Sequence, residues 1–332
     1  MSANPILAEV TRGDLVESFH RGSIAVVDSA GRLLASWGDV DRLVYSRSSA
    51  KPFQALATHE SGAFEALGLS EEELALHCAS HNGEAGHEQR IAAWLKKLEL
   101  SEADLECGPQ TPMWVNWDLI NANKAPAPSK IRNNCSGKHA GFLSACVHQG
   151  FDTQGYTDPK HPVQQRVAQV LQDMACSVVT TMPCSTDHCS APVFAQPQRD
   201  FARAMAQFAD PSGLSSKRAD SCVAIFNAMR ANPWLIGGTN RVDTIVMSDP
   251  SYSGILKIGA EAVHGLAIPE AKLGIAIKID DGSQRVLGAV VVAVLQKLGL
   301  LSGEMSSDMS ILANPPIHNF AGLLVGEIRA TL

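Results

Sequence analysis

The chain has 332 residues, of which 45% are hydrophobic and 18% are charged, so it can bury a large core and is not disordered. Its 27 basic and 34 acidic residues give a net charge of −7 without a basic stripe, which argues against a nucleic-acid partner. No apolar run approaches the length of a membrane span, and the first residues lack the apolar core of a secretory signal. We therefore expect a cytoplasmic globular protein whose eight cysteines are free thiols or metal ligands.

The two ends of the chain have the short hydrophobic period of β-strands. Two apolar runs at residues 24–28 and 33–37 flank a turn-rich joint, which predicts a β-hairpin. The C-terminal part predicts further strands, a second hairpin turn at 280–283 and a closing helix. The predicted strands are 245–247, 254–258 and 273–279, and the predicted helix is 286–298. Periodicity alone does not distinguish this last, nearly all-apolar helix from a buried strand.

The middle of the chain has the spacing of amphipathic helices. Seven segments place apolar residues at helical intervals: 51–67, 71–78, 87–98, 137–148, 162–176, 198–208 and 217–229. Because strands and helices do not alternate regularly, a doubly wound parallel sheet is not expected. The pattern predicts an α+β fold in one composite domain over residues 1–332. Its antiparallel sheet is built from about residues 1–50 and 243–332, with a helical region over about 51–242.

The first candidate for chemistry is the pair Ser48 and Lys51, at the junction between the first strands and the first helix. On one helical turn, residues three apart share a face, so the hydroxyl and the amine can meet. A serine becomes a nucleophile when a base takes its proton, and a desolvated lysine can be that base. The alternative is an ordinary helix start with a solvated lysine, because S-x-x-K is a short motif.

The segment 77–84 concentrates polar side chains, including His77, Ser80, His81, Asn82 and Glu84, directly after an apolar helix. Such a density of titratable groups is costly to bury, which indicates a site. The alternative is a helix C-terminus whose histidines bond the last carbonyl groups. Trp114 and Trp117 are interpreted as packing residues rather than a binding site.

Two cysteine-bearing segments, 133–139 and 183–189, could together form a metal site. Thiolates from Cys135 and Cys189 with a nitrogen or oxygen donor suit a soft or borderline ion, and chemistry alone favours His139 or His188 as the nitrogen ligand. Neither segment has zinc-finger spacing, and buried cysteines often behave as small hydrophobic residues. Lys257, in a late strand, is either an inward-facing general base or a solvated charge at a sheet edge.

Taken together, these motifs resemble the rhizobial-type L-asparaginases, the third structural class of asparaginase. The resemblance covers nearly the whole chain, in order. It rests on five motifs: Ser48-x-x-Lys51, Ser80 after His77-Cys78-Ala79, the run from Asn134 to His139, Asp187-His188-Cys189, and Lys257-x-Gly259-Ala260-Glu261. That family has a fold similar to serine β-lactamases and penicillin-binding proteins.

The resemblance implies two Ser–Lys pairs, Ser48 with Lys51 and Ser80 with Lys257. It also implies a zinc site beside the pocket, made by Cys135, Lys138, Cys189 and a water molecule, with Asp187 close to that water. Lysine replaces histidine as the nitrogen ligand, which requires that its amine lose a proton. We further expect Arg47, His139 and Asp187 to bind the substrate, and we expect a homodimer.

The expected activity is hydrolysis of L-asparagine to L-aspartate and ammonia, an amidohydrolase reaction in which zinc is not strictly required for the chemistry. Ser48 is the leading nucleophile, with Ser80 as the alternative. Two other functions stay open. One is a β-lactamase-like or peptide-processing serine hydrolase, although no S-D-N or K-T-G element is present. The other is a zinc-containing amide-binding protein without turnover.

Overall fold

The computed structural model describes residues 3–115, 119–120, 122–177 and 183–332. The chain divides into two compact units. Unit 1 consists of Met1–Ser49, Gln196–Asp210 and Ile245–Leu332, and unit 2 consists of Ala50–Ala195 and Pro211–Thr244.

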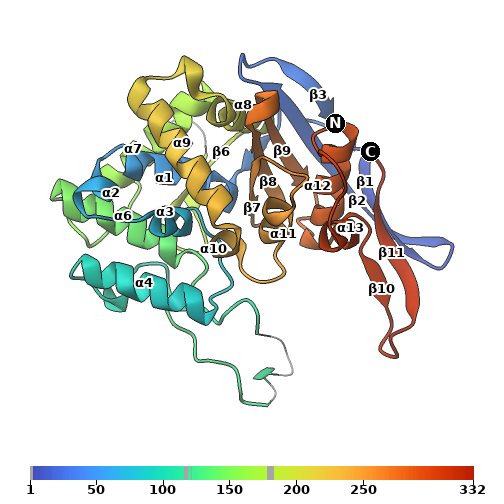
Figure 1. Ribbon diagram of the computed structural model, residues 1–332, viewed down its shortest axis with the longest axis horizontal. Coiled ribbons are helices and arrows are strands. Elements are labelled where there is room, and N and C mark those ends of the chain that lie inside the picture. The colour runs from blue at the N-terminus through green and yellow to red at the C-terminus, as the bar shows by residue number, and fades with distance from the viewer. Residues whose placement is uncertain (1–2, 116–118, 121, 178–182) are drawn as a thin grey trace. The chain divides into compact units, whose positions relative to one another are not determined.

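Unit 1 is built on an antiparallel sheet. The strand order is β10-β11-β1-β2-β9-β8-β7, and β3 pairs with β2 (Figure 1). The N-terminal half of the long strand β2 pairs with β1, and its C-terminal half pairs with β9 and β3. The sheet therefore joins both ends of the chain, as the sequence predicts. The strands of this sheet are β1 (Ile6–Arg12), β2 (Leu15–Asp28), β3 (Leu33–Trp37), β7 (Ile255–Gly259), β8 (Val263–Ile268), β9 (Leu273–Ile279), β10 (Pro316–His318) and β11 (Leu324–Ala330).

The helices of unit 1 bury the apolar side chains of this sheet. Helix α8 (Gln198–Ala209) packs on β2, β8 and β9, and α12 (Leu287–Lys297) packs on β1, β11 and α13 (Ser307–Ala313). The approach of α8 to β9 depends on Gly274, because a Cβ there would lie 2.0 Å from the carbonyl oxygen of Ala202. Strands β7 and β8 are buried at every position, and this includes two polar residues, Lys257 in β7 and His264 in β8.

Unit 2 is mainly helical, and α1 (Lys51–His59) lies at its centre, in contact with α3, α6, α7 and α9. All residues of α1 except its last are buried. A short hairpin of β5 and β6 completes the unit's regular structure. The further elements that lie in unit 2, or cross its boundary, are α2 (Ala63–Ala66), α3 (Glu71–His77), α4 (Ala85–Lys97), α6 (Ser136–Gln149), α7 (Pro162–Ala175), β5 (Cys184–Thr186), β6 (Pro192–Pro197), α9 (Ser216–Ala231), α10 (Pro233–Gly237) and α11 (Val242–Ser248).

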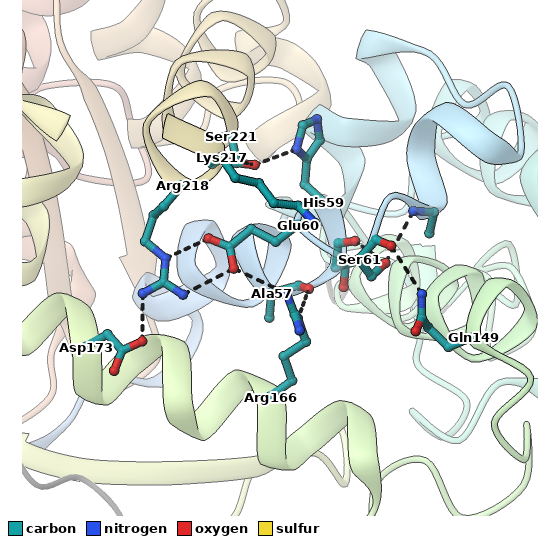
Figure 2. Close-up of polar contacts among 12 residues, drawn as sticks. Ala57, His59, Glu60, Ser61, Gln149, Arg166, Asp173, Lys217, Arg218 and Ser221 are labelled. Atoms are coloured by element: carbon teal, nitrogen blue, oxygen red, sulfur yellow. Dashed lines mark hydrogen bonds and ion pairs between the residues drawn. The ribbon is translucent and has the colours of Figure 1, made fainter. Parts of the chain in front are cut away.

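The C-terminal end of α1 is held by a buried carboxylate (Figure 2). Glu60 is only 5% exposed, and its two oxygen atoms accept hydrogen bonds from Arg218 at 2.6 and 3.1 Å. Arg166 adds a longer bond to Glu60 at 3.4 Å and donates to the carbonyl oxygen of Ala57. Because Arg166 comes from α7 and Arg218 from α9, this network joins α1 to both helices.

Helices α3 and α6 approach each other closely because glycines line the contact. A Cβ at Gly137 would lie 2.2 Å from the carbonyl oxygen of Leu76, and one at Gly141 would lie 1.4 Å from Nδ1 of His77. These two glycines are four residues apart and therefore share one face of α6. The contact fixes the helix that carries the 133–139 motif against the helix that precedes Ser80.

The structure confirms most of the predicted elements, including the hairpin of β2 and β3 and the closing helix α12. Three predictions are wrong. Residues 245–247 belong to helix α11, the turn at 280–283 leads into a helix rather than a hairpin, and the helix predicted over 51–67 is two helices. The break has a local cause, since Gly62 adopts a left-handed conformation with φ of +87°.

The fold class is α+β with an antiparallel sheet, as predicted. One helix from the predicted helical region, α8, belongs to the unit that contains the sheet. Within the described residues, no helix combines the length and apolar character needed to cross a bilayer.

Candidate active site

The S-x-x-K motif lies where a 3-10 helix over Arg47–Ala50 runs into α1, so Lys51 is the first residue of α1. The side chain of Ser48 is half-buried, whereas that of Lys51 is fully buried. Arg47 has a φ of +49°, a left-handed backbone conformation that side chains other than glycine rarely adopt. The turn before α1 is therefore a strained segment, of the kind that often occurs at functional sites.

Within unit 1, strand β7 brings its end against the Ser48 turn. Gly259, the last residue of β7, lies so close that a Cβ would be 2.8 Å from the carbonyl oxygen of Ser46. Lys257, two residues earlier, is fully buried and its Nζ donates a hydrogen bond to the carbonyl oxygen of Ile258 at 2.9 Å. It is thus not a solvated charge at a sheet edge. Its pairing with Ser80, a residue of unit 2, stays a prediction.

Within unit 2, the amine of Lys51 contacts the segment that follows α3. Its Nζ lies 3.0 Å from Oγ of Ser80, and it also donates to the carbonyl oxygens of Ala79 and, at 3.4 Å, Asn134. Ser80 is 3% exposed, and its own N–H donates to the carbonyl oxygen of Ile236 at 2.9 Å. The lysine amine and the serine hydroxyl are therefore within the distance needed for direct proton transfer.

His81 connects the segment after α3 with the start of α6. The backbone N–H of Gly83 donates to Nδ1 of His81 at 3.0 Å, so the ring proton resides on Nε2. Nε2 lies 3.0 Å from Oγ of Ser136, which in turn donates to the carbonyl oxygen of Ile131. This chain of hydrogen bonds fixes the two polar motifs, 77–84 and 133–139, relative to each other.

The thiols of Cys135 and Cys189 meet in the interior of unit 2. Both residues are almost fully buried, and Nζ of the buried Lys138 lies 2.8 Å from Sγ of Cys189. A hydrogen bond from Cys189, aided by the charges of Lys51 and Lys138, holds the pKa of Cys135 well below its usual range. The same hydrogen bond, together with burial, raises the pKa of Cys189. Of the two thiols, Cys135 therefore loses its proton more readily.

The lysine beside these sulfurs is a cation. Burial alone would lower the pKa of Lys138, but the neighbouring Cys189 and Cys135 raise it above its ordinary value. The half-buried carboxylate of Asp187 acts electrostatically on the same group of residues. The structure thus brings together the three residues that the resemblance implies as zinc ligands, with the predicted aspartate near them.

The donor set of this cluster fits a zinc ion. Sulfur atoms of cysteine are ligands that zinc prefers, and the amine can bind once a metal displaces its proton. Among the described residues, no group of three or more histidine, cysteine or acidic side chains could hold a metal ion. The cluster of Cys135, Lys138 and Cys189 is not such a group, because only its two cysteines are of these residue types and its third donor would be the amine of Lys138. Of the two histidines that the sequence offered as ligands, His188 has an exposed side chain.

His139 is fully buried, and its Nδ1 lies 2.7 Å from Oη of Tyr156. Burial, reinforced by the charges of Lys138 and Lys51, lowers the pKa of His139 well below its usual value. The ring is therefore uncharged at neutral pH and offers no positive charge to a substrate carboxylate. The predicted role of His139 in substrate binding gains no support from this position, and that of Arg47 stays a prediction.

Some contacts at the site have no signature in the sequence. The carbonyl oxygens of Ala79 and Asn134 accept hydrogen bonds from the amine of Lys51. The hydroxyl oxygen of Ser136 accepts one from Nε2 of His81. Every residue carries a backbone carbonyl, so no residue type marks these acceptors. Trp117, which we interpreted as a packing residue, lies outside the described residues.

Comparison with known proteins gives one family and several distant structural similarities. The family model described as L-asparaginase II matches residues 8–330. Among curated proteins, no sequence matches the chain. A β-lactamase from Mycobacterium bovis is 15% identical, with 83% of this chain and 94% of that chain covered and a TM-score of 0.40.

Two further solved structures are similar at the same level. A β-lactamase from Sphaerobacter thermophilus is 13% identical, with 86% of this chain and 94% of that chain covered and a TM-score of 0.44. The protein named Mglu, in its native form, is 15% identical, with 91% of this chain and 67% of that chain covered and a TM-score of 0.45.

Proposed function

Because the chain belongs to the L-asparaginase II family, we propose that this hydrolase converts L-asparagine to L-aspartate and ammonia. The observation that carries the proposal furthest is the hydrogen bond of 3.0 Å between Nζ of Lys51 and Oγ of Ser80. Hydrolysis of an amide requires a nucleophile and a base that later protonates the leaving amine. A buried lysine bonded to a serine hydroxyl, three residues after a second serine, supports such a reaction.

In the proposed mechanism, the hydroxyl oxygen of Ser48 attacks the side-chain amide carbon of asparagine. Lys51, whose ammonium group must first lose a proton to solvent, acts as the neutral amine: it takes the hydroxyl proton and then delivers it to the amide nitrogen, so that the C–N bond breaks and ammonia leaves. Water then attacks the ester formed on Ser48, and the proton of that water returns to Ser48 through Lys51. Aspartate is released and both residues regain their starting protonation states.

The second serine and the second lysine have supporting roles in this proposal. Ser80 accepts a hydrogen bond from Lys51, so it can relay a proton to or from that amine. Lys257 would be the partner of Ser80 on its other side, and its complete burial agrees with such a role. If Ser80 is the nucleophile instead, Lys51 is already positioned as its base.

Cys135, Lys138 and Cys189 would hold a zinc ion in this proposal. Bound there, the ion would supply positive charge beside the pocket. Lys138 lies in the first turn of α6, Cys135 directly precedes that helix, and Cys189 lies in the segment after β5, so these residues would position the ion. Asp187 lies near this group and would orient the water that completes the site. We expect zinc to support substrate affinity more than the chemical step.

Release of ammonia tests the proposal most directly. We expect purified protein to release ammonia from L-asparagine, more slowly from L-glutamine, and to leave a β-lactam intact. Ser48→Ala should remove the activity, whereas Ser61→Ala, a half-buried serine that bonds the carbonyl oxygen of Thr58, should not. Binding of asparagine without ammonia release would contradict the proposal and favour a binding protein. The expected cytoplasmic homodimer can be tested by sedimentation and by localisation.

A further inference from the structure

Unit 2 contains a cavity of about 610 Å³ that the proposed reaction does not use. Its walls include Asn82, Glu84, Met113, Trp114, Thr239 and Arg241. Neither the Lys51–Ser80 pair nor the cluster of thiols lines it. Its volume falls within the range of about 300–1,000 Å³ that is typical of small-molecule sites.

One wall of the cavity holds a negative charge in a fixed position. The N–H and hydroxyl groups of Thr239 each donate to one carboxylate oxygen of Glu84 at 2.8 Å, and Asn82 adds a third hydrogen bond at 3.1 Å. Burial alone would raise the pKa of Glu84, but these hydrogen bonds lower it. Gly238 makes the arrangement possible, because a Cβ there would lie 2.6 Å from Oε1 of Glu84.

A positive charge lies on the same wall. Nη1 of Arg241 donates to Oδ1 of Asn82 at 3.2 Å and contacts Sδ of Met113 at 3.4 Å. Within the part of the chain that the structure describes, Arg241 makes no ion pair, and its Nε and Nη2 atoms have no hydrogen-bond acceptor. The guanidinium group therefore retains donors for a ligand.

The carboxamide of Asn82 lies between the two charges. Its oxygen accepts from Arg241 and its nitrogen donates to Glu84, so the two charged groups are linked through Asn82 rather than paired with each other. Asn82 is itself buried and further bonded to the carbonyl oxygen of Thr239 at 3.0 Å. These hydrogen bonds of Asn82 keep the guanidinium group of Arg241 and the carboxylate of Glu84 apart.

An apolar surface completes the cavity. Met113 and Trp114 are 42% and 43% exposed, large values for side chains of this type. The indole N–H of Trp114 donates to the carbonyl oxygen of Gly83 at 3.4 Å, which leaves the ring face as a contact surface. A ligand side chain could pack against these two residues.

We infer that this cavity binds a free α-amino acid, with its carboxylate on Arg241, its ammonium group on Glu84 and its side chain against Met113 and Trp114. An arginine presents donors in a planar fork that matches a carboxylate, and an ionised glutamate accepts from an ammonium group. A simple anion would be repelled by Glu84, and a simple cation would be repelled by Arg241. A zwitterion satisfies both. The site goes beyond the proposed reaction, because no bond in its ligand changes.

Titration calorimetry on the full chain tests this site with L-aspartate, L-leucine and L-phenylalanine as probes. We expect at least one of them to bind in the millimolar range or tighter. Arg241→Met should weaken that binding about tenfold or more, because a charge-assisted bond to the carboxylate is lost. The same compound without its amino group, succinate in the case of aspartate, should also bind about tenfold more weakly.

Three further variants make the result decisive. Arg329→Met removes an arginine from a surface pair with Glu9 in unit 1 and should leave binding unchanged. Arg241→Lys keeps the charge and should bind more tightly than Arg241→Met, which separates recognition from a folding defect. Lys51→Met should retain the binding. Equal affinity in wild type and Arg241→Met, no binding of any probe, or loss of binding in Lys51→Met would each overturn the inference.

Discussion

The amine of Lys51 and the hydroxyl of Ser80 are hydrogen-bonded at 3.0 Å although the two residues are 29 positions apart in the chain. Lys51 begins α1, and Ser80 follows α3. The contact joins two motifs that the sequence analysis assigned to different Ser–Lys pairs. Lys51 therefore contacts Ser80 directly, and it follows Ser48 by three residues in the sequence.

The kinetics of serine and lysine variants should reflect this arrangement. We expect Ser48→Ala and Lys51→Ala each to lower kcat by about 10³-fold or more, and the double variant to be little worse than either, because residues that act as a unit are not additive. Ser80→Ala should lower kcat less than Ser48→Ala. Steady-state ammonia release measures these effects. Near-normal activity of Ser48→Ala with an inactive Ser80→Ala would transfer the role of nucleophile to Ser80.

The thiol cluster should bind zinc without being needed for folding. We expect Cys135→Ala and Cys189→Ala to lose tightly bound zinc, to remain folded and to raise KM more than they lower kcat, because the large core already stabilises the chain. Cys222→Ala, a buried thiol in α9, is the matched control and should retain the metal. Elemental analysis and kinetics on the same samples give the answer. Wild type that contains no zinc and gains no activity or affinity from added zinc would refute the site.

The contact between α3 and α6 should be intolerant of any side chain at Gly141. A Cβ there would lie 1.4 Å from the ring of His77, so Gly141→Ala should lower the free energy of unfolding by about 2 kcal/mol or more. Gly213→Ala is the control, since a Cβ at Gly213 meets no atom within 4 Å. Urea denaturation of both variants measures the difference. Equal stability of the two variants would show that the helices can separate freely.

The buried carboxylate of Glu60 should contribute more to stability than an exposed ion pair of the same type. Glu60→Gln removes the charge that faces Arg218 and Arg166, and we expect a loss of about 3 kcal/mol because Arg218 is only 17% exposed. Glu72→Gln, which breaks a surface pair with Arg90, should cost less than about 1 kcal/mol. A similar cost for both changes, measured by denaturation, would mean that the network does not anchor α1.

Stability should fall in acid partly because of His77. Its burial, with added repulsion from Lys138 and Lys51, lowers its pKa to about 3, whereas the ordinary value is 6.5. Between these pH values His77 binds a proton in the unfolded chain but not in the folded chain. The free energy of unfolding therefore falls by about 1.4 kcal/mol for each unit by which the pH is lowered. His77→Gln should therefore show a shallower decline between about pH 6 and pH 4.

The control for this measurement is His318→Gln, which changes an exposed histidine in β10 and should leave the decline unchanged. Free energies of unfolding from urea titrations at several pH values give the slopes. Identical slopes for wild type and His77→Gln would show that His77 is protonated in the folded state over this range.

From sequence alone, most of the helices and strands could be predicted, and the motifs of the candidate site could be named. Helical spacing predicted α3, α4, α6, α7, α8 and α9, and the motif from Asn134 to His139 indicated a cluster of functional groups at the start of α6. The spacing of apolar residues within one segment indicates which face of a helix or strand is buried, so the type of element can be predicted without knowing its neighbours in space. It failed at residues 245–247, where a short apolar run fits a strand and a buried helix equally well.

Which of these residues come into contact depends on how distant segments pack, and this could not be predicted from the sequence. Three contacts join segments that are distant in the chain: the hydrogen bond from Lys51 to Ser80, the hydrogen bond between Cys135 and Cys189, and the link from Arg241 to Glu84 through Asn82. Such contacts depend on how helices pack, and packing here depends on glycines such as Gly141 whose role is the absence of a side chain. Burial then sets the charges, because a desolvated group keeps or loses its proton according to its neighbours in space rather than in sequence.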